Sequence, residues 1–229
     1  MTKVLAVNGS PNMEKGGKEV LLRPFLQGME DAGAEVRLVY ASKLKVKPCL
    51  GEFHCWTERP GECFIKDAMQ DVYPALKEAD IWVFGTPVYI PLPGDMANFI
   101  NRLVPFVDPV LVTRGGRTRA RTLPGTKLKS VVLVSTSGWW EVGNFGTVVR
   151  TMEEFAKDVS VEFAGPVLRP HVDWMRSKGE LTEGGRKVLD AARQAGRQMV
   201  ERGRIDPRLL RAISAPLISR REHNRWEME

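Results

Sequence analysis

Residues 3–18 read Lys3-Val-Leu-Ala-Val-Asn-Gly-Ser-Pro-Asn-Met-Glu-Lys-Gly-Gly-Lys18, and this stretch decides the fold. The apolar run from Val4 to Val7 is typical of a buried strand in a parallel sheet, which is apolar on both faces. The run ends at Asn8-Gly9-Ser10-Pro11, which is turn chemistry, and an amphipathic helix pattern follows. A strand, a small-residue loop and a helix N-terminus point several backbone N–H groups at one spot. Such a spot favours a phosphate.

Strand and helix patterns alternate along the rest of the chain. We expect further strands over residues 35–40, 80–85, 129–136 and 160–168, separated by helical stripes of apolar residues. This alternation predicts an α/β fold with a five-stranded parallel sheet that is covered by helices on both sides. Five strands suit the doubly wound order 2-1-3-4-5, in which a ligand binds at the carboxyl ends of strands 1 and 3.

The domain boundary is placed after the last helical pattern, which ends at Gly203. We assign residues 1–203 to the α/β domain and residues 204–229 to a C-terminal arm. The arm contains Pro and Arg and one apolar patch, Ala215–Ile218, and we expect it to contact a second subunit.

Two segments interrupt the regular pattern. Pro24 lies inside the first helical stripe, so either the helix starts near Arg23 or it is kinked there. Residues 114–124 are basic and contain Gly, and we expect a solvated, irregular connection. Its arginines, which could instead meet the 2′-phosphate of a nicotinamide dinucleotide or a neighbouring subunit, are Arg114, Arg117, Arg119 and Arg121.

Composition narrows the class of protein. The 229 residues carry 34 basic and 28 acidic side chains, a net charge of +6 that is spread along the chain and indicates solubility. No apolar run approaches the ~20 residues of a membrane span, and no signal-peptide pattern is present. We expect a cytoplasmic protein with no membrane and no nucleic-acid partner. The three cysteines lie within residues 49–63, which suits a metal or redox role better than a secreted disulfide framework.

The first loop excludes two kinds of phosphate site. A nucleoside-triphosphate P-loop needs Gly, four residues and then Gly-Lys-Ser/Thr, whereas seven residues separate Gly9 from Gly17 here and Glu19 follows Lys18. The dinucleotide pattern Gly-x-Gly-x-x-Gly is also absent. Ser10, Gly17 and Lys18 instead offer hydroxyl, amide and ammonium groups to a single phosphate.

Two later loops reach the same edge of the predicted sheet. Thr86–Gly94 contains Pro87-Val88-Tyr89-Ile90, a rigid backbone with an aromatic side chain that could stack on a ring or cover it. Ser135–Phe145 contains Ser137-Gly138-Trp139-Trp140 directly after a strand. Small and aromatic residues in these loops favour a flat, aromatic ligand with a phosphate tail. A hydrolase triad is excluded, because no Gly-x-Ser-x-Gly precedes His171 and Asp173, and His171 is interpreted as structural.

Three motifs give the sequence its family resemblance: Asn8-Gly9-Ser10-Pro11, the cysteine loop from Pro48 to Met69, and Gly85-Thr86-Pro87-Val88-Tyr89. They resemble the NADPH-dependent FMN reductase and iron–sulfur flavoprotein group, which has the flavodoxin-like fold, and the resemblance covers about residues 1–170. It implies bound FMN, with NAD(P)H as a substrate. The residues implied to bind FMN lie in the three loops and are Ser10, Pro11, Asn12, Gly17, Lys18, Pro87, Val88, Tyr89, Ile90, Ser137, Gly138 and Trp139.

The cysteine loop departs from that resemblance. Iron–sulfur flavoproteins place a fourth cysteine between Cys49 and Cys55, and this chain has Glu52 there, which argues against a four-iron cluster. A zinc site is chemically possible, but its adjacent His and Cys ligands would have difficulty facing one metal; its ligands would be Cys49, His54, Cys55 and Cys63. The third alternative is a metal-free loop, anchored by Trp56, that walls a pocket or a subunit contact.

The function that these observations predict is an FMN-dependent NAD(P)H oxidoreductase, which passes reducing equivalents to a quinone, a flavin or a similar small-molecule acceptor. Since the cofactor carries this chemistry, no side chain is assigned as catalytic. The alternatives are an iron–sulfur flavoprotein-type electron carrier and an FMN-binding regulatory protein without turnover. Because related proteins are oligomers, we expect a homodimer or a homotetramer.

Overall fold

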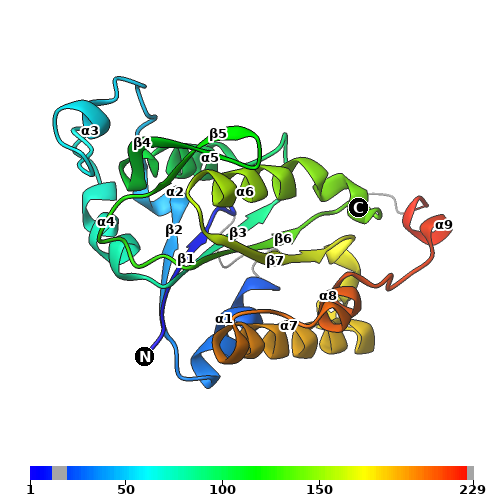
Figure 1. Ribbon diagram of the computed structural model, residues 1–229. Coiled ribbons are helices and arrows are strands. Elements are labelled where there is room, and N and C mark those ends of the chain that lie inside the picture. Colours follow the sequence, from blue (N-terminus) through cyan, green and yellow to red (C-terminus); the bar gives the residue numbers. More distant parts are fainter. Residues whose placement is uncertain (12–19, 226–229) are drawn as a thin grey trace.

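The computed structural model describes residues 1–11 and 20–225. A five-stranded parallel sheet lies at its centre, formed by β1 (Lys3–Asn8), β2 (Glu35–Tyr40), β3 (Ile81–Pro87), β6 (Ser130–Thr136) and β7 (Glu162–Arg169). The strands lie in the order β2-β1-β3-β6-β7 (Figure 1), and all neighbours are parallel. Counted among these five strands alone, the order is 2-1-3-4-5, so the predicted fold class and strand order are confirmed.

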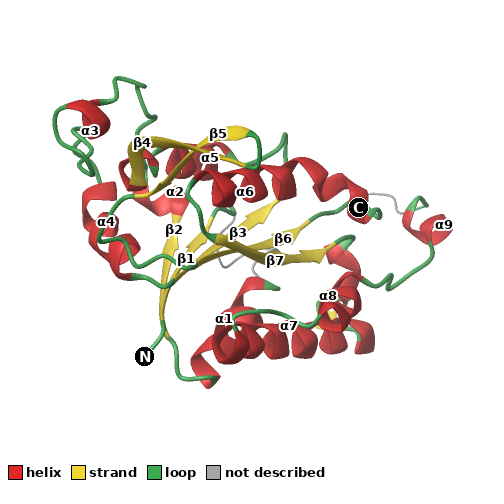
Figure 2. Ribbon diagram, viewed as in Figure 1, coloured by secondary structure: helices red, strands yellow, loops and turns green. Residues whose placement is uncertain are grey.

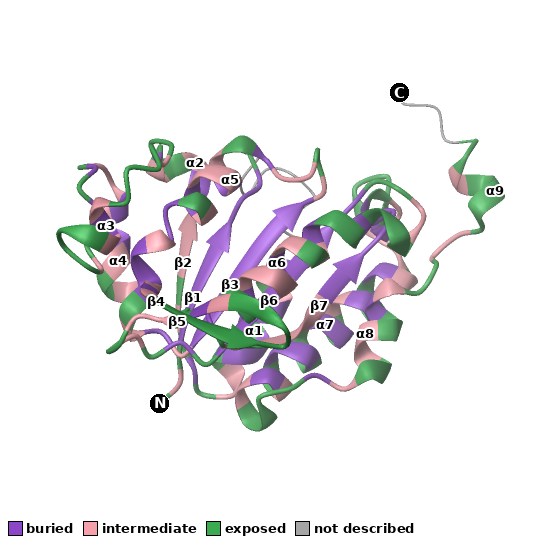
Figure 3. Ribbon diagram, turned by 45° about the horizontal axis from the view of Figure 1, so that its top comes forward, coloured by how far each residue is buried: buried purple, intermediate pink, exposed green. Residues whose placement is uncertain are grey.

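Helices cover both faces of the sheet (Figure 2). One face carries α1 (Leu22–Asp31) and α7 (Glu183–Arg202); the other carries α4 (Met69–Glu78), α5 (Gly94–Asn101) and α6 (Gly146–Asp158). Successive residues of β1 alternate between the two cores: Val4 and Ala6 pack with α1 and α7, while Leu5 and Val7 pack on the opposite side. Both faces of the central strands are therefore buried (Figure 3), which explains their continuous apolar runs.

A close approach of α1 and α7 depends on two glycines. A Cβ atom built on Gly28 would lie 1.8 Å from the carbonyl oxygen of Arg193, and one on Gly196 would lie 1.9 Å from that of Phe25. Both distances are far below van der Waals contact, so each helix needs a glycine where the other crosses it. Pro24 lies in the first turn of α1, whose N–H groups have no intrahelical acceptor, and the helix accommodates it there.

The prediction of an irregular connection at residues 114–124 is wrong. A two-stranded antiparallel hairpin forms there from β4 (Val107–Arg114) and β5 (Arg117–Thr122), with Gly115 and Gly116 at its turn in positive φ. The hairpin is mostly exposed (Figure 3), and of β5 only Ala120 is buried. Because β5 reads Arg-Thr-Arg-Ala-Arg-Thr, it lacks the apolar alternation by which a half-buried strand is recognised.

Short elements complete the chain. Between β2 and the cysteine loop lies α2 (Ala41–Leu44), and the loop itself contains α3 (His54–Thr57). After β7 come the two-residue strands β8 (Arg176–Ser177) and β9 (Glu180–Leu181). Four-residue or shorter 3₁₀ turns lie at Val104–Phe106, Val142–Phe145 and Val172–Met175. In the C-terminal arm, α8 (Pro207–Ser214) packs against α7 and β7, and α9 (Arg220–His223) follows at the edge of the molecule (Figure 1). The division into 1–203 and 204–229 stays a prediction.

Candidate functional site

The three candidate loops leave the sheet at the carboxyl ends of β1, β3 and β6, which are adjacent strands. Backbone hydrogen bonds tie them together beyond the sheet. Gly9 N–H donates to the carbonyl oxygen of Gly85 at 2.7 Å, and Val88 N–H donates to that of Thr136 at 2.9 Å. The structure therefore brings the described parts of all three loops to one edge, as the strand order predicts.

The first loop buries polar atoms that the described residues do not satisfy. Ser10 is 2% exposed, and its N–H donates to Asn8 Oδ1 at 2.8 Å. Within residues 1–11 and 20–225, however, the buried atoms Ser10 Oγ and Asn8 Nδ2 have no hydrogen-bond partner. A buried polar atom without a partner costs about 1–3 kcal/mol, so two of them two residues apart indicate a place for an outside acceptor.

The other predicted residues of this loop are less informative. Pro11 is exposed. Asn12, Gly17 and Lys18 lie outside the described residues, so their predicted role stays a prediction. Gly9 has a packing reason of its own, because a Cβ atom there would lie 2.6 Å from Met96 Cε. This contact sets α5 close beneath the first loop.

The second loop presents apolar side chains to solvent. Pro87 ends β3 and is buried, Val88 is half-buried, and Tyr89 and Ile90 are 43% and 100% exposed. Tyr89 N–H donates to the carbonyl oxygen of Pro91 at 2.9 Å, across a cis Ile90–Pro91 peptide bond. This tight turn holds the backbone of the loop in place while its aromatic and aliphatic side chains face outward.

The third loop is fixed by hydrogen bonds to the end of β7. Ser137 N–H donates to the carbonyl oxygen of Arg169 at 3.0 Å, and Ser137 Oγ accepts from Trp139 N–H at 3.1 Å. His171 N–H in turn donates to the carbonyl oxygen of Trp139 at 2.8 Å. The Trp139 side chain remains 63% exposed, so this loop, like the second, offers an aromatic surface on a firmly held backbone.

The C-terminal arm reaches the third loop, which the sequence does not predict. His223 Nε2 donates to the carbonyl oxygen of Gly138 at 2.8 Å. Trp140 Nε1–H donates to the carbonyl oxygen of Ile218 at 3.2 Å, and Arg220 pairs with Glu141 at 2.7 Å. Residues 213–223 are thus engaged within this chain and form part of the wall behind the third loop. The predicted oligomer contact of the arm stays a prediction.

A buried arginine holds the middle of this arm. Arg169 is fully buried and donates to the carbonyl oxygens of Ile213 and Ala215 at 2.7 and 2.9 Å. None of the carboxylates in the described parts of the chain pairs with it, so carbonyl oxygens and the His171 ring take its N–H groups. Burial lowers the pKa of Arg169 to about 10.

His171 has the structural role that the sequence predicts, and it is neutral. Its Nε2 accepts from Arg169 at 2.7 Å and from Leu217 N–H at 3.0 Å, which places the ring proton on Nδ1. Burial, together with the charge of Arg169, lowers the pKa of His171 to about 4. The Trp140 ring lies nearly parallel to it, with an angle of 18° between the planes.

The cysteine loop is held by a buried ion pair. Arg102 and Asp67 are 0% and 6% exposed, and Arg102 Nη1 lies 2.7 Å from Asp67 Oδ2. Arg102 also donates to the carbonyl oxygens of Lys47 and Ile65, on either side of the three cysteines. Burial opposes ionisation of Asp67, but hydrogen bonds from Arg102 and from backbone N–H groups outweigh it and lower its pKa.

The cysteines themselves are free thiols. Burial raises the pKa of Cys55 to about 11, with smaller contributions from Cys63, Glu52 and Cys49, so the thiol stays protonated. In the part of the chain that the structure describes, no three His, Cys, Asp or Glu side chains come together as metal ligands do. This geometry supports neither the cluster nor the zinc alternative. Iron and zinc analysis of the purified protein tests both.

No helix among the described residues is long and apolar enough to cross a membrane.

Comparison with known proteins places this sequence in a family. A sequence profile described as NADPH-dependent FMN reductase matches residues 2–144. An iron–sulfur flavoprotein of Archaeoglobus fulgidus is 31% identical over 119 residues, which are 52% of this chain and 54% of that protein. One of Methanocaldococcus jannaschii is 37% identical over 87 residues, 38% of this chain and 42% of that protein. The chain spans about half the length of the curated relatives it matches.

Solved structures agree in fold. An NAD(P)H:quinone oxidoreductase from Methanothermobacter marburgensis superposes with a TM-score of 0.62 at 14% identity, covering 86% of this chain and 98% of that one. An azoreductase from Bacillus anthracis gives 0.55 at 18% identity, covering 87% and 99%. At these identities the likeness shows the fold alone. The profile match, in contrast, spans more than half of the sequence, and this chain therefore belongs to the NADPH-dependent FMN reductase family.

Proposed function

We propose that this protein is an FMN-dependent NAD(P)H oxidoreductase, which passes reducing equivalents through bound FMN to a quinone, a flavin or a similar small acceptor. Family membership supports the cofactor and the reductant. The structural neighbours named as a quinone oxidoreductase and as azoreductases support a small aromatic acceptor.

One observation carries the proposal: the buried donors Ser10 Oγ and Asn8 Nδ2 lie at the carboxyl end of β1 without partners among the described residues. Phosphate oxygens accept hydrogen bonds from both kinds of group, and such bonds to a charged acceptor are about twice as strong as neutral ones. The residues present therefore fit an FMN phosphate at the first loop.

The other two loops supply surfaces for the ring. Tyr89 and Trp139 offer exposed aromatic faces, and backbone hydrogen bonds at Val88 and Ser137 hold the loops that carry them. Ser137 Oγ accepts from Trp139 N–H, and none of the described residues takes its own hydrogen, which can be donated to a ligand. When bound, FMN supplies the hydride and electron chemistry, and these residues bind and orient it.

Absorbance spectra of the purified protein, recorded before and after NADPH is added without oxygen, test the proposal. We expect a flavin spectrum that bleaches on reduction and recovers when a quinone is added. Iron analysis of the same sample separates this activity from that of a cluster-containing electron carrier. Protein that lacks flavin and is not stabilised by added FMN in a melting experiment would contradict the proposal.

A matched pair of variants tests the phosphate site. Thr126 Oγ1 is also buried without a partner among the described residues, but Thr126 precedes β6 and lies at the opposite edge of the sheet. We expect Ser10→Ala to weaken FMN binding by about tenfold, as loss of a hydrogen bond to a charged group implies, and Thr126→Val to leave it unchanged. If the two variants bind FMN with equal affinity, Ser10 does not contact the FMN phosphate.

A further inference from the structure

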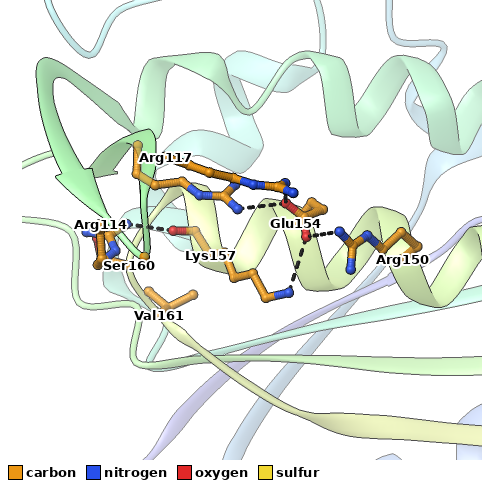
Figure 4. A pocket seen from close by; sticks show the side chains of 9 residues that line it. Arg114, Arg117, Arg150, Glu154, Lys157, Ser160 and Val161 are labelled. Carbon is orange, nitrogen blue, oxygen red and sulfur yellow. Dashed lines mark hydrogen bonds and ion pairs between the residues drawn. The ribbon is translucent and has the colours of Figure 1, made fainter.

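A cavity of about 600 Å³ lies where the β4–β5 hairpin packs on α6, and its lining includes none of the candidate FMN residues. Six charged side chains line it: Arg114, Arg117, Arg119, Arg150, Glu154 and Lys157. Figure 4 shows Arg117 reaching in from the hairpin and Arg150 and Lys157 from α6, with Glu154 between them. We call this cavity the arginine pocket.

A single carboxylate meets four of these cations. Glu154 Oε1 lies 2.9 Å from Arg150 and 3.2 Å from Lys157, while Oε2 lies 2.8 Å from Arg119 and 3.7 Å from Arg117. Hydrogen bonds from Arg119 and Lys157, with the charge of Arg150, lower the pKa of Glu154 to about 2. Each oxygen of Glu154 therefore meets two cations, and the four cations share its single negative charge; only Arg119 and Arg150 also reach a second carboxylate, Asp158 and Glu153 respectively, among the described residues.

Two of the arginines, Arg114 and Arg119, fasten the hairpin to α6. Arg114 donates to the carbonyl oxygen of Lys157 at 2.6 Å, near the C-terminus of α6, where cations are favoured. Arg119 is 11% exposed and bonds to both Glu154 and Asp158. These contacts fasten the hairpin to the helix and fix both guanidinium groups in place.

The other three cations are more exposed and share Glu154, Arg117 from the hairpin and Arg150 and Lys157 from one turn away on α6. Arg117, Arg150 and Lys157 are 64%, 56% and 52% exposed, and each turns toward Glu154 rather than away into solvent. Including the neighbours Asp158 and Glu153, five cations face three carboxylates. Like charges held together in this way repel one another, and a bound anion would relieve that repulsion.

We propose that the arginine pocket binds a nucleotide through its phosphomonoester group. A phosphomonoester carries nearly two negative charges and three acceptor oxygens, which guanidinium groups contact in pairs. The volume lies within the 300–1,000 Å³ typical of small-molecule sites and is much larger than one phosphate needs. Val161 and the flat faces of the guanidinium groups offer surfaces on which a base can lie.

This nucleotide has two chemical sources, which share the phosphomonoester. One is the adenosine 2′-phosphate half of NADPH, since arginine accommodates the 2′-phosphate in other nicotinamide-dinucleotide sites. The other is a separate adenine nucleotide that binds without taking part in turnover. The binding proposal is independent of the proposed FMN chemistry; only its assignment to NADPH rests on that function.

Calorimetric titration with 2′,5′-ADP at low salt tests binding directly and needs no turnover. We expect the Arg117→Gln/Arg150→Gln variant to bind at least about tenfold more weakly, because two charge-assisted contacts are lost. Arg59→Gln is the matched control: Arg59 is 71% exposed and pairs with Glu62, and its loss should leave the affinity unchanged. Raising the salt concentration should weaken binding to the unaltered protein.

Glu154→Gln has the opposite expected effect, which a misfolded variant could not imitate. Removal of the competing carboxylate should tighten 2′,5′-ADP binding several-fold. The proposal is overturned if 2′,5′-ADP binds no better than adenosine, if the double variant binds as tightly as the unaltered protein, or if inorganic phosphate binds as tightly as the nucleotide.

Steady-state kinetics then separate the two sources. If the double variant raises KM for NADPH but not for NADH, the pocket holds the NADPH phosphate. If 2′,5′-ADP binds but does not compete with NADPH, the ligand is a separate nucleotide.

Discussion

Nε2 of His171 lies 2.7 Å from Nη2 of Arg169, and both side chains are fully buried. A neutral imidazole thus serves as acceptor for a cation that no carboxylate among the described residues neutralises. Leu217 N–H donates to the same ring nitrogen, so one protonation event would break two contacts at once. The contact of Leu217 in the C-terminal arm with this ring therefore depends on His171 remaining unprotonated.

Acid is expected to destabilise the protein through this histidine. The folded-state pKa of about 4 lies below the ordinary value of 6.5, so between these pH values the unfolded chain binds the proton more readily. The contribution of His171 to stability is complete above pH 6.5 and is lost as the pH falls toward 4, by at most about 3 kcal/mol. Denaturant unfolding of the unaltered protein and of His171→Gln between pH 7.5 and 4 should show their free energies converging as the pH falls. A constant difference would contradict it.

Loss of the arginine is expected to release the arm. Arg169→Met leaves the carbonyl oxygens of Ile213 and Ala215 without their donor, each at a cost of about 1–3 kcal/mol. Trypsin should then cleave within residues 204–221 faster than in the unaltered protein, as followed by mass spectrometry. Arg186→Met, which removes an exposed arginine bonded to Leu181, is the control and should not change the cleavage rate. Equal rates in Arg169→Met and the control would show that other contacts hold the arm.

The crossing of α1 and α7 is expected to tolerate no side chain. Gly196→Ala places a Cβ atom against the carbonyl oxygen of Phe25, and the helices must separate, at a cost of about 1–3 kcal/mol or more. Gly146→Ala is the control, because nothing lies within 4 Å of its Cβ position and alanine favours the helix. Thermal melts should show a lower Tm for the first variant and an equal or higher Tm for the second. A Tm for Gly196→Ala equal to that of the unaltered protein would contradict the close crossing.

Breaking the buried ion pair is expected to unfasten the cysteine loop. Asp67→Asn leaves the fully buried Arg102 without its carboxylate, which typically costs about 3–5 kcal/mol. Glu62→Gln removes one partner of an exposed pair and should cost less than about 1 kcal/mol. Thiol-specific labelling of Cys55 and Cys63, both buried, should accelerate in Asp67→Asn alone. Slow labelling in both variants would mean that the loop does not depend on this pair.

The sheet could be predicted from the sequence because its strands are buried on both faces. Runs such as Val4–Val7 carry the signal by themselves, and the alternation of strands with helices then determines the parallel order. The hairpin gave no such signal: Val110 and Leu111 are more than half exposed, and β5 is held by ion pairs between arginines and α6. Contacts between distant charged residues leave no period in the sequence.

The candidate site, too, was only partly predictable from the sequence. A general rule about strand ends brings the loops at Ser10, Val88 and Ser137 together, and the hydrogen bonds between their backbones agree with it. The arm contact was not predictable, because His223 donates to a backbone carbonyl oxygen 85 residues away, at Gly138. Any residue at position 138 has this backbone oxygen, so the residue type at that position does not indicate a contact with His223.

The contact between His223 and Gly138 also sets an order of events during synthesis. Domains begin to fold while the chain is still being made, with the N-terminal part first. The sheet can assemble once β7 has left the ribosome, but the wall behind Gly138 waits for some fifty further residues, counted from Arg169 to His223. A ligand that contacts this wall would therefore bind only after the sheet has folded and the C-terminal arm has docked on the third loop.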